Sequence, residues 1–524
     1  MTRPGPFAAC VLVLTACTEL ATTPASHATI TPAVGALAPP STLYDGERRH
    51  VAVTLTRADG APIGTDHVSW TSNVDSVVHV DAGAVCATDT STFARASHAC
   101  LIARSPGTVQ IKVTLAQPGL ATVDTTFKLT VTQRWIDLAA STGSVCAINV
   151  KYQLFCWGAK ELVGTGKAKA ELVPRAVLTA GMQYERVYAG GTAACGVPLG
   201  TALAYCWGHN AYGAAGLGPT VLDAPVPTLP LNAPFLAIAI GPNASCGIRA
   251  SGAVSCWGLL LGDAASVASV PCQDEPSSRC VYGVSDWITI RDLRESATSV
   301  GVGGYHGCIG AGPAVQCWGS NRRGQLGRGT IDSELLRAPF ATLSLGAGRR
   351  ADVALAFDHS CAVLGADTNT DRSTWCWGSN DRGESGIATC AATASGYCDA
   401  PTPVRLPVDF RAIALGFQHG CGVQASGVVQ CWGSNEYGQL GRGTATDTLP
   451  HVAPAPVRIE SIRRFDRIAS SDTFVCALTV SDGAIYCWGG NIYGNLGTGD
   501  VIRRDVPTRV AEPFTSTLTV TPGR

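Results

Sequence analysis

Val428-Val429-Gln430-Cys431-Trp432-Gly433 ends in a tripeptide, Cys-Trp-Gly, that occurs seven times in this chain of 524 residues. The seven tryptophans are Trp157, Trp207, Trp257, Trp318, Trp377, Trp432 and Trp488, separated by 50, 50, 61, 59, 55 and 56 residues. A period near 50 residues is typical of propellers and solenoids, in which one supersecondary unit is repeated. The sequence therefore predicts a repeat protein.

Each Cys-Trp-Gly is preceded by a second cysteine in an alternating stretch. In the sixth repeat, Gly420-Cys421-Gly422-Val423 is followed by the turn Ala425-Ser426-Gly427 and then by the strand that ends at Gly433. Alternation around a Ser-Gly turn predicts a β-hairpin. The two cysteines then face each other on adjacent strands, and only the turn changes as their spacing varies from 9 to 15 residues.

The chain has 22 cysteines, and all except Cys10 and Cys17 fall into ten near-neighbour pairs. Zinc sites use two close C-x(2 to 4)-C knuckles, which these spacings do not match, and so many cysteines are typical of an exported protein with disulfides. The expected pairs are Cys86–Cys100, Cys146–Cys156, Cys195–Cys206, Cys246–Cys256, Cys272–Cys280, Cys308–Cys317, Cys361–Cys376, Cys390–Cys398, Cys421–Cys431 and Cys476–Cys487.

The N-terminus has the pattern of an export signal. Arg3 precedes the short apolar run 7–14, and Leu14-Thr15-Ala16-Cys17 resembles the lipobox of bacterial lipoproteins. That resemblance implies a signal peptide at 1–16, a lipidated Cys17 followed by a tether to residue 27, and an outer-membrane or cell-surface location. The alternative is an ordinary signal peptide with Cys17 incidental.

A glycine-rich turn follows Cys-Trp-Gly, clearest in Gly433-Ser434-Asn435-Glu436-Tyr437-Gly438-Gln439-Leu440-Gly441-Arg442-Gly443-Thr444. These turns and the period resemble the regulator-of-chromosome-condensation repeats, over about residues 134–510. The resemblance implies a seven-bladed β-propeller, which we place at 134–515 with a tail at 516–524. We expect the strand at 507–510 to complete blade one, because the first repeat begins abruptly at Trp135.

Residues 28–133 alternate short strands and turns, which predicts a small β-sandwich. Segments such as Val68-Ser69-Trp70-Thr71-Ser72 resemble bacterial immunoglobulin-like domains of group two. Cys86 and Cys100 would then brace a loop of that domain. The expected fold class is all-β throughout.

No residue pattern indicates catalysis, a cofactor or a metal. The 38 basic residues are balanced by 39 acidic ones, which excludes a cationic nucleic-acid-binding surface. The glycine-rich turns lack the lysine of a phosphate-binding loop. We expect His306, His359 and His419 to be hydrogen-bonded core or channel residues, and the seven tryptophans to pack blade against blade.

Two insertions follow the glycine-rich turns of repeats three and five, at 264–284 and 387–400, and each contains a cysteine pair. Loops on a rigid scaffold are frequent binding sites. The sequence therefore favours a non-enzymatic envelope lipoprotein that binds a protein or glycan at the end of the propeller bearing these insertions. The alternatives are an extracellular polysaccharide enzyme and, by fold analogy alone, a guanine-nucleotide exchange factor.

Overall fold

The computed structural model describes residues 28–32, 42–57, 67–82, 96–116, 122–166, 169–179, 181–210, 212–217, 221–228, 234–259, 270–271, 279–285, 296–332, 338–346, 350–365, 372–387, 398–443 and 452–513. The expected signal peptide, Cys17, the tether and the tail at 516–524 lie outside these ranges. Every regular element within them is a β-strand, and no helix there is long and apolar enough to cross a membrane. The chain divides into two compact units, Met1–Arg134 and Trp135–Arg524.

Unit 1 contains two four-stranded sheets that enclose one core. The first sheet has the order β1 (Ala28–Pro32), β3 (Arg48–Arg57), β6 (Ala96–Ala103) and β5 (Val78–Ala82); the second has β2 (Thr42–Tyr44), β8 (Val123–Thr132), β7 (Gly107–Leu115) and β4 (Val68–Ser72). Both sheets contribute to the cluster around Leu101 and Ile111. The indole of Trp70 in one sheet donates a hydrogen bond to Ser97 Oγ in the other, at 3.0 Å.

Unit 2 consists of seven antiparallel sheets that follow one another along the chain, numbered here sheets 1 to 7. Sheet 1 contains β9 (Trp135–Ser141), β10 (Ser144–Asn149), β11 (Leu154–Gly158) and β12 (Glu171–Ala176). Sheet 2 contains β13 (Tyr184–Gly190), β14 (Ala193–Pro198), β15 (Tyr205–His209) and β16 (Asp223–Thr228). Sheet 3 contains β17 (Ala237–Ile240), β18 (Ala244–Ile248), β19 (Val254–Leu259), β20 (Val270–Pro271) and β21 (Arg279–Ser285). Sheets 4 and 5 are β22 (Ser299–Val302), β23 (His306–Ala311), β24 (Ala314–Gly319) and β25 (Ala338–Ser344); and β26 (Arg350–Leu355), β27 (His359–Gly365), β28 (Ser373–Ser379) and β29 (Asp399–Arg405). Sheets 6 and 7 are β30 (Ala412–Leu415), β31 (His419–Val423), β32 (Val429–Ser434) and β33 (Val452–Arg458); and β34 (Phe465–Ser470), β35 (Phe474–Thr479), β36 (Ile485–Gly489) and β37 (Arg504–Arg509).

The Cys-Trp-Gly hairpin forms the middle of every sheet. In sheet 6, Cys421 lies directly opposite Cys431, and Gly420 lies opposite Trp432. The same register recurs in the other sheets, where each repeat cysteine is disulfide-bonded to its own Cys-Trp-Gly partner. The paired cysteines are 9 residues apart in sheet 4 and 15 residues apart in sheet 5, yet they lie opposite each other in both, so only the length of the turn differs.

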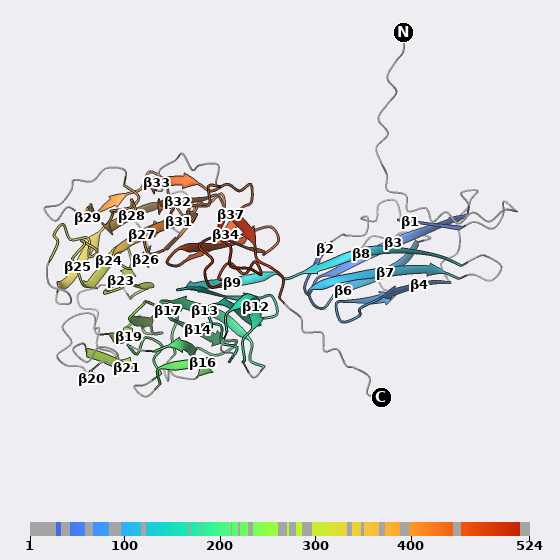
Figure 1. Cartoon of the computed structure of the whole chain (residues 1–524), viewed down its shortest axis with the longest axis horizontal. Coiled ribbons are helices and arrows are strands. Elements are labelled where there is room, and N and C mark those ends of the chain that lie inside the picture. Colours follow the sequence, from blue (N-terminus) through green and yellow to red (C-terminus); the bar gives the residue numbers. More distant parts are fainter. Residues whose placement is uncertain are drawn as a thin grey trace, which may run out of the picture. The chain divides into compact units, whose positions relative to one another are not determined.

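The first strands of the seven sheets form a ring of neighbours. Each of these strands contacts the first strand of the next sheet, in the order β9, β13, β17, β22, β26, β30 and β34. The last strand, β34, contacts β9. In Figure 1 the teal strand β9 accordingly lies beside the red strands of sheet 7. Sheets arranged in this way around a centre form a β-propeller.

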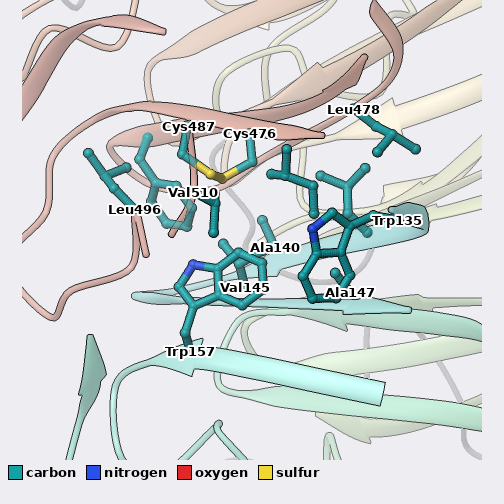
Figure 2. Packing of buried hydrophobic residues seen from close by; sticks show 13 residues of the cluster. Trp135, Ala140, Val145, Ala147, Trp157, Cys476, Leu478, Cys487, Leu496 and Val510 are labelled. Atoms are coloured by element: carbon teal, nitrogen blue, oxygen red, sulfur yellow. A yellow bond between two sulfur atoms is a disulfide. The ribbon is translucent and has the colours of Figure 1, made fainter. Parts of the chain in front are cut away.

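Side-chain packing joins sheet 1 to sheet 7 and thereby closes the ring. Trp135 and Trp157 of sheet 1 share a buried cluster with Leu478 and the Cys476–Cys487 disulfide of sheet 7 (Figure 2). The Trp157 indole also donates a hydrogen bond to the carbonyl of Asn495, at 3.0 Å. These contacts leave the first and last repeats in direct apposition.

The expected completion of blade one by the strand at 507–510 is wrong. That segment belongs to β37, which pairs with β36 through Cys487↔Thr508, and sheet 1 has its own fourth strand in β12. Each repeat begins with its inner strand, so the repeat that starts at Trp135 is already complete. A salt bridge of 2.7 Å between Arg467 and Asp137 adds to the closure without strand exchange.

Candidate binding face

Two kinds of loop meet at one end of the propeller. The first kind, the rim loops, joins the first and second strands of each sheet and includes residues 303–305, 356–358, 416–418 and 471–473. The second kind is the glycine-rich turn. In sheet 6 the N–H of Ser434, the residue after Cys-Trp-Gly, donates a hydrogen bond to the carbonyl of Gln418 in the rim loop at 2.8 Å, and the other sheets repeat this bond. We call this end of the propeller the rim face.

An asparagine organises the glycine-rich turns from within. The side-chain oxygen of Asn435 accepts a hydrogen bond from the N–H of Leu440 at 2.9 Å, and Asn321 and Asn491 make the equivalent bond to Leu326 and Leu496. These polar groups therefore stabilise the turn itself. The segments are turns, as the sequence predicts.

The seven tryptophans are buried and connect successive sheets. Their exposed fraction is 2% or less. The indole of Trp377 donates a hydrogen bond of 2.8 Å to the carbonyl of Gln325, in the glycine-rich turn of the preceding sheet, and Trp432 bonds Glu384 in the same way. A β-bulge between the flanking cysteine and glycine interrupts pairing with the fourth strand at each tryptophan. The side chain thereby packs on the neighbouring sheet.

The glycine of Cys-Trp-Gly cannot be replaced without strain. Gly433 has φ +92°, and a Cβ atom there would lie 2.5 Å from the carbonyl oxygen of Gln418. A left-handed conformation with a close backbone neighbour requires glycine. The close approach of the rim loop therefore explains why the third residue of the tripeptide is always glycine.

The three histidines occupy equivalent positions opposite that glycine in sheets 4, 5 and 6. His306 Nε2 lies 2.8 Å from Ser360 Oγ, and His419 Nε2 lies 2.9 Å from Ser470 Oγ, each in the next sheet. Burial lowers the pKa of all three, including His359, to about 3. They are therefore neutral core residues at neutral pH that connect sheets.

These histidines make the unfolding free energy depend on pH. Between the unfolded pKa of about 6.5 and the folded pKa of about 3, the unfolded chain binds more protons, so stability falls as pH falls. At pH 5 each histidine is expected to remove about 2 kcal/mol relative to pH 7.5. We expect His359→Phe to reduce the drop in melting temperature between these pH values, because Phe474 occupies the equivalent position in sheet 7. An undiminished drop would contradict the assignment.

Arg323 anchors the base of the second insertion. This side chain of sheet 4 forms salt bridges with Asp399 at 2.7 Å and Asp381 at 2.6 Å in sheet 5. Asp381 also accepts a hydrogen bond from the N–H of Cys398 at 2.8 Å, and Cys398 is disulfide-bonded. The carboxylates raise the pKa of Arg323 further above its ordinary value, although its burial opposes this. The sequence analysis missed this cluster, because its residues come from different repeats.

The parts of both insertions that the structure describes are mainly strands, because β20 and β21 lie in the first insertion and β29 begins in the second. Residues 279–285 form β21, which pairs with β19 through Leu259↔Cys280, and residues 399–405 form β29. The expectation that 264–284 and 387–400 are loops throughout is therefore wrong at their C-terminal ends and at 270–271, which pair with β21 as β20. Cys86, Cys272 and Cys390 lie outside the described residues, as does the side chain of Cys280; Cys100 is disulfide-bonded.

Two cavities differ in position and character. A central cavity of about 140 Å³ lies among the ends of the inner strands and includes Phe357, Phe417 and Asp472 of the rim loops. A wider groove of about 740 Å³ opens between sheets 1 and 2 at the opposite, hairpin end, where it is lined by Gln183 and Tyr205. No group of three or more potential metal ligands occurs in the described ranges.

Comparison with known families finds the model "Regulator of chromosome condensation (RCC1) repeat" at residues 426–478 and 482–521, and a second model of the same description at 410–439. Among curated proteins, the Ultraviolet-B receptor UVR8 of Arabidopsis thaliana is 32% identical over 204 residues, covering 38% of this chain and 42% of that protein. The human E3 ubiquitin-protein ligase HERC2 is 27% identical over 318 residues, covering 59% of this chain and 6% of that protein. The chain thus spans less than half the length of these relatives.

Two solved structures share the fold. Prp20p from Saccharomyces cerevisiae, in a study of its binding to Gsp1p and histones, aligns with a TM-score of 0.57 at 20% identity, over 71% of this chain and 88% of that one. Yeast RCC1 (Prp20) bound to Kap60 gives a TM-score of 0.56 at 20% identity, over 74% and 85% of the two chains. At this identity the likeness establishes the propeller fold and nothing about activity.

Proposed function

Because the chain contains RCC1 repeats and folds its second unit as a β-propeller, we propose that it is an exported, non-enzymatic binding protein that holds a protein partner at the rim face. The observation that carries the proposal is the disulfide in every sheet of the propeller. A reducing cytosol does not sustain so many structural disulfides. An exported chain of this kind would meet its partner outside the cytosol.

Rigidity of the rim face supports a binding role. The rim loops and glycine-rich turns hydrogen-bond to one another, and Arg323 fixes the base of the second insertion. Surfaces ordered before contact lose little conformational entropy on binding, which favours affinity. The solved relatives are named for binding Kap60, Gsp1p and histones, so the scaffold is suited to protein partners. A glycan is the second candidate ligand.

The remaining assignments complete the proposal. Each of the seven sheets would be one blade, unit 1 would be the immunoglobulin-like domain, and Cys17 would carry the lipid that retains the protein at the outer membrane or cell surface. The two-sheet core of unit 1 and the ring of inner-strand contacts support the first two assignments. The lipobox-like sequence at 14–17 supports the third.

Removal of the insertions tests the proposal. Residues 264–278, which include the two-residue edge strand β20, and residues 388–397 are replaced by short turns, with Cys280→Ser and Cys398→Ser to avoid unpaired thiols, so that β21, β29 and Asp399 remain. We expect the affinity for a partner captured by the form starting at residue 28 to fall by about tenfold or more, because contact residues are lost without loss of the scaffold. Surface plasmon resonance measures the affinity, and thermal melting confirms folding.

The matched control shortens residues 366–371, which connect the ends of β27 and β28 that lie away from the rim loop, and should bind as the parent does. Unchanged affinity in the insertion variant, together with loss in the control, would contradict the choice of face. Treatment of the captured partner with protease or with glycosidase distinguishes a protein from a glycan.

A further inference from the structure

Three aromatic side chains from successive rim loops contact one another, and two of them line the opening of the central cavity, which we call the channel mouth. The rings of Tyr305 and Phe357 lie 5.7 Å apart in an edge-to-face arrangement, and those of Phe357 and Phe417 lie 5.5 Å apart. Phe357 and Phe417 also line the central cavity. Phe417 is 46% exposed. A large aromatic ring held open to solvent beside a cavity is available for contact with a ligand.

A carboxylate lies in the next rim loop. The N–H of Phe417 donates a hydrogen bond of 3.3 Å to the carbonyl of Asp472, so the two residues are neighbours across sheets 6 and 7. Asp472 lines the cavity and is solvent-exposed, and its side chain hydrogen-bonds to Thr142. Partial desolvation of its carboxylate raises the pKa of Asp472 above its ordinary value, and hydrogen bonds to Thr142 and to its own backbone oppose this. Within the part of the chain that the structure describes, Asp472 forms no salt bridge.

We propose that the channel mouth is a site for an organic ammonium cation. Phe417 and Phe357 contact the carbon groups attached to its nitrogen, and Asp472 balances its charge. Aromatic faces attract cations through their quadrupole, most strongly where water is partly excluded. A cavity of about 140 Å³ admits a side-chain-sized group rather than a folded segment. The cation is either the end of a lysine side chain on a partner protein or a free quaternary ammonium.

The remaining lining disfavours an anion, because none of its described residues is basic. Ser470 and Ser471 add hydroxyl groups to the lining, and the rest is aliphatic or backbone. The basic side chain Arg467 is at the start of β34, at the far end of the strand from Asp472, where it is paired with Asp137. The site does not depend on the insertions, so it can be tested separately from the proposed function.

Calorimetric titration of the whole chain with choline, with Nα-acetyl-lysine amide and with the neutral choline isostere 3,3-dimethylbutanol tests the site. We expect one or both cations to bind in the millimolar range and the isostere to bind at least about tenfold more weakly. Binding of choline alone would indicate a free ammonium ligand, and binding of the lysine derivative would indicate a protein side chain. Equal binding of choline and its isostere, or no binding of either cation up to about 100 mM, would overturn the proposal.

Variants locate the site. Asp472→Asn should weaken cation binding by about tenfold and Phe417→Leu by about threefold, while both retain the parent melting temperature. Asp409→Asn is the matched control, because Asp409 precedes β30 at the hairpin end and pairs with Arg405 at 3.3 Å. It should bind as the parent does. Equal weakening by Asp409→Asn, or none by Asp472→Asn, would overturn the proposal. If a variant fails to fold, the comparison of choline with its isostere on the parent protein still tests the site.

Discussion

Full reduction of the repeat disulfides is expected to lower the melting temperature of the propeller further than any single substitution. Each bond closes a hairpin with a sequence separation of 9 to 15 residues. In the chain-entropy model a loop of that length contributes about 3 kcal/mol, and measured values are often lower. Because the bonds occur in all seven sheets, their loss destabilises the whole ring. Scanning calorimetry with and without reductant measures the effect.

A single pair provides the control for this experiment. The double variant Cys308→Ala with Cys317→Ala removes the bond of sheet 4 and should cost about 3 kcal/mol at most, far less than full reduction. Both cysteines are fully buried, so alanine leaves the surroundings apolar. A melting temperature insensitive to reductant would show that these bonds do not carry the stability assigned to them.

The second large effect is expected at the tryptophans. Trp377→Ala should destabilise the propeller by about 3 to 5 kcal/mol, because it leaves a cavity between sheets 4 and 5 and removes the hydrogen bond to Gln325. Trp375→Ala is the matched control: Trp375 is two residues away, is partly exposed, and bonds Ser373 of its own strand. It should cost much less. Equal losses in chemical denaturation would contradict the role of Trp377 between sheets.

The sequence predicts the hairpin because its determinants are local and repeated, whereas the period alone leaves a propeller and a solenoid open, and only the resemblance to known repeats implies the propeller. Cys421 and Cys431 flank a short turn, so alternation alone places them opposite each other. The bulge that turns Trp432 toward the preceding sheet depends on the fourth strand, whose sequence varies between repeats. Its position therefore required the structure.

Ring closure could not be predicted from the pattern of strands. The ring can close by exchange of a terminal strand or by side-chain packing, and the segment 507–510 is a strand in both cases. The two differ only in whether β37 pairs with sheet 1 or with β36. The contacts that join sheets 7 and 1, such as Arg467 with Asp137, link residues 330 positions apart. No local signal identifies such a pair.

The channel mouth was missed for a related reason. The rim loops of four successive sheets each contribute one side chain to it: Tyr305, Phe357, Phe417 and Asp472. The residue type is not the same in all four repeats, so no repeated motif marks the position. Their proximity arises from the ring. The histidines, in contrast, recur at one position in three repeats, and all three are buried. His306 and His419 have the expected hydrogen bonds, to Ser360 and Ser470, whereas both ring nitrogens of His359 are buried without one in the part of the chain that the structure describes.

Peptide mass mapping under non-reducing conditions, on protein taken from the membrane fraction of the cells that make it, tests most directly whether this is an exported, disulfide-braced propeller. We predict that each first cysteine is bonded to its own Cys-Trp-Gly partner, as Cys421 is to Cys431, and that the N-terminal peptide begins with a lipidated Cys17. Free thiols at the repeat cysteines, or bonds between different repeats, would contradict the account.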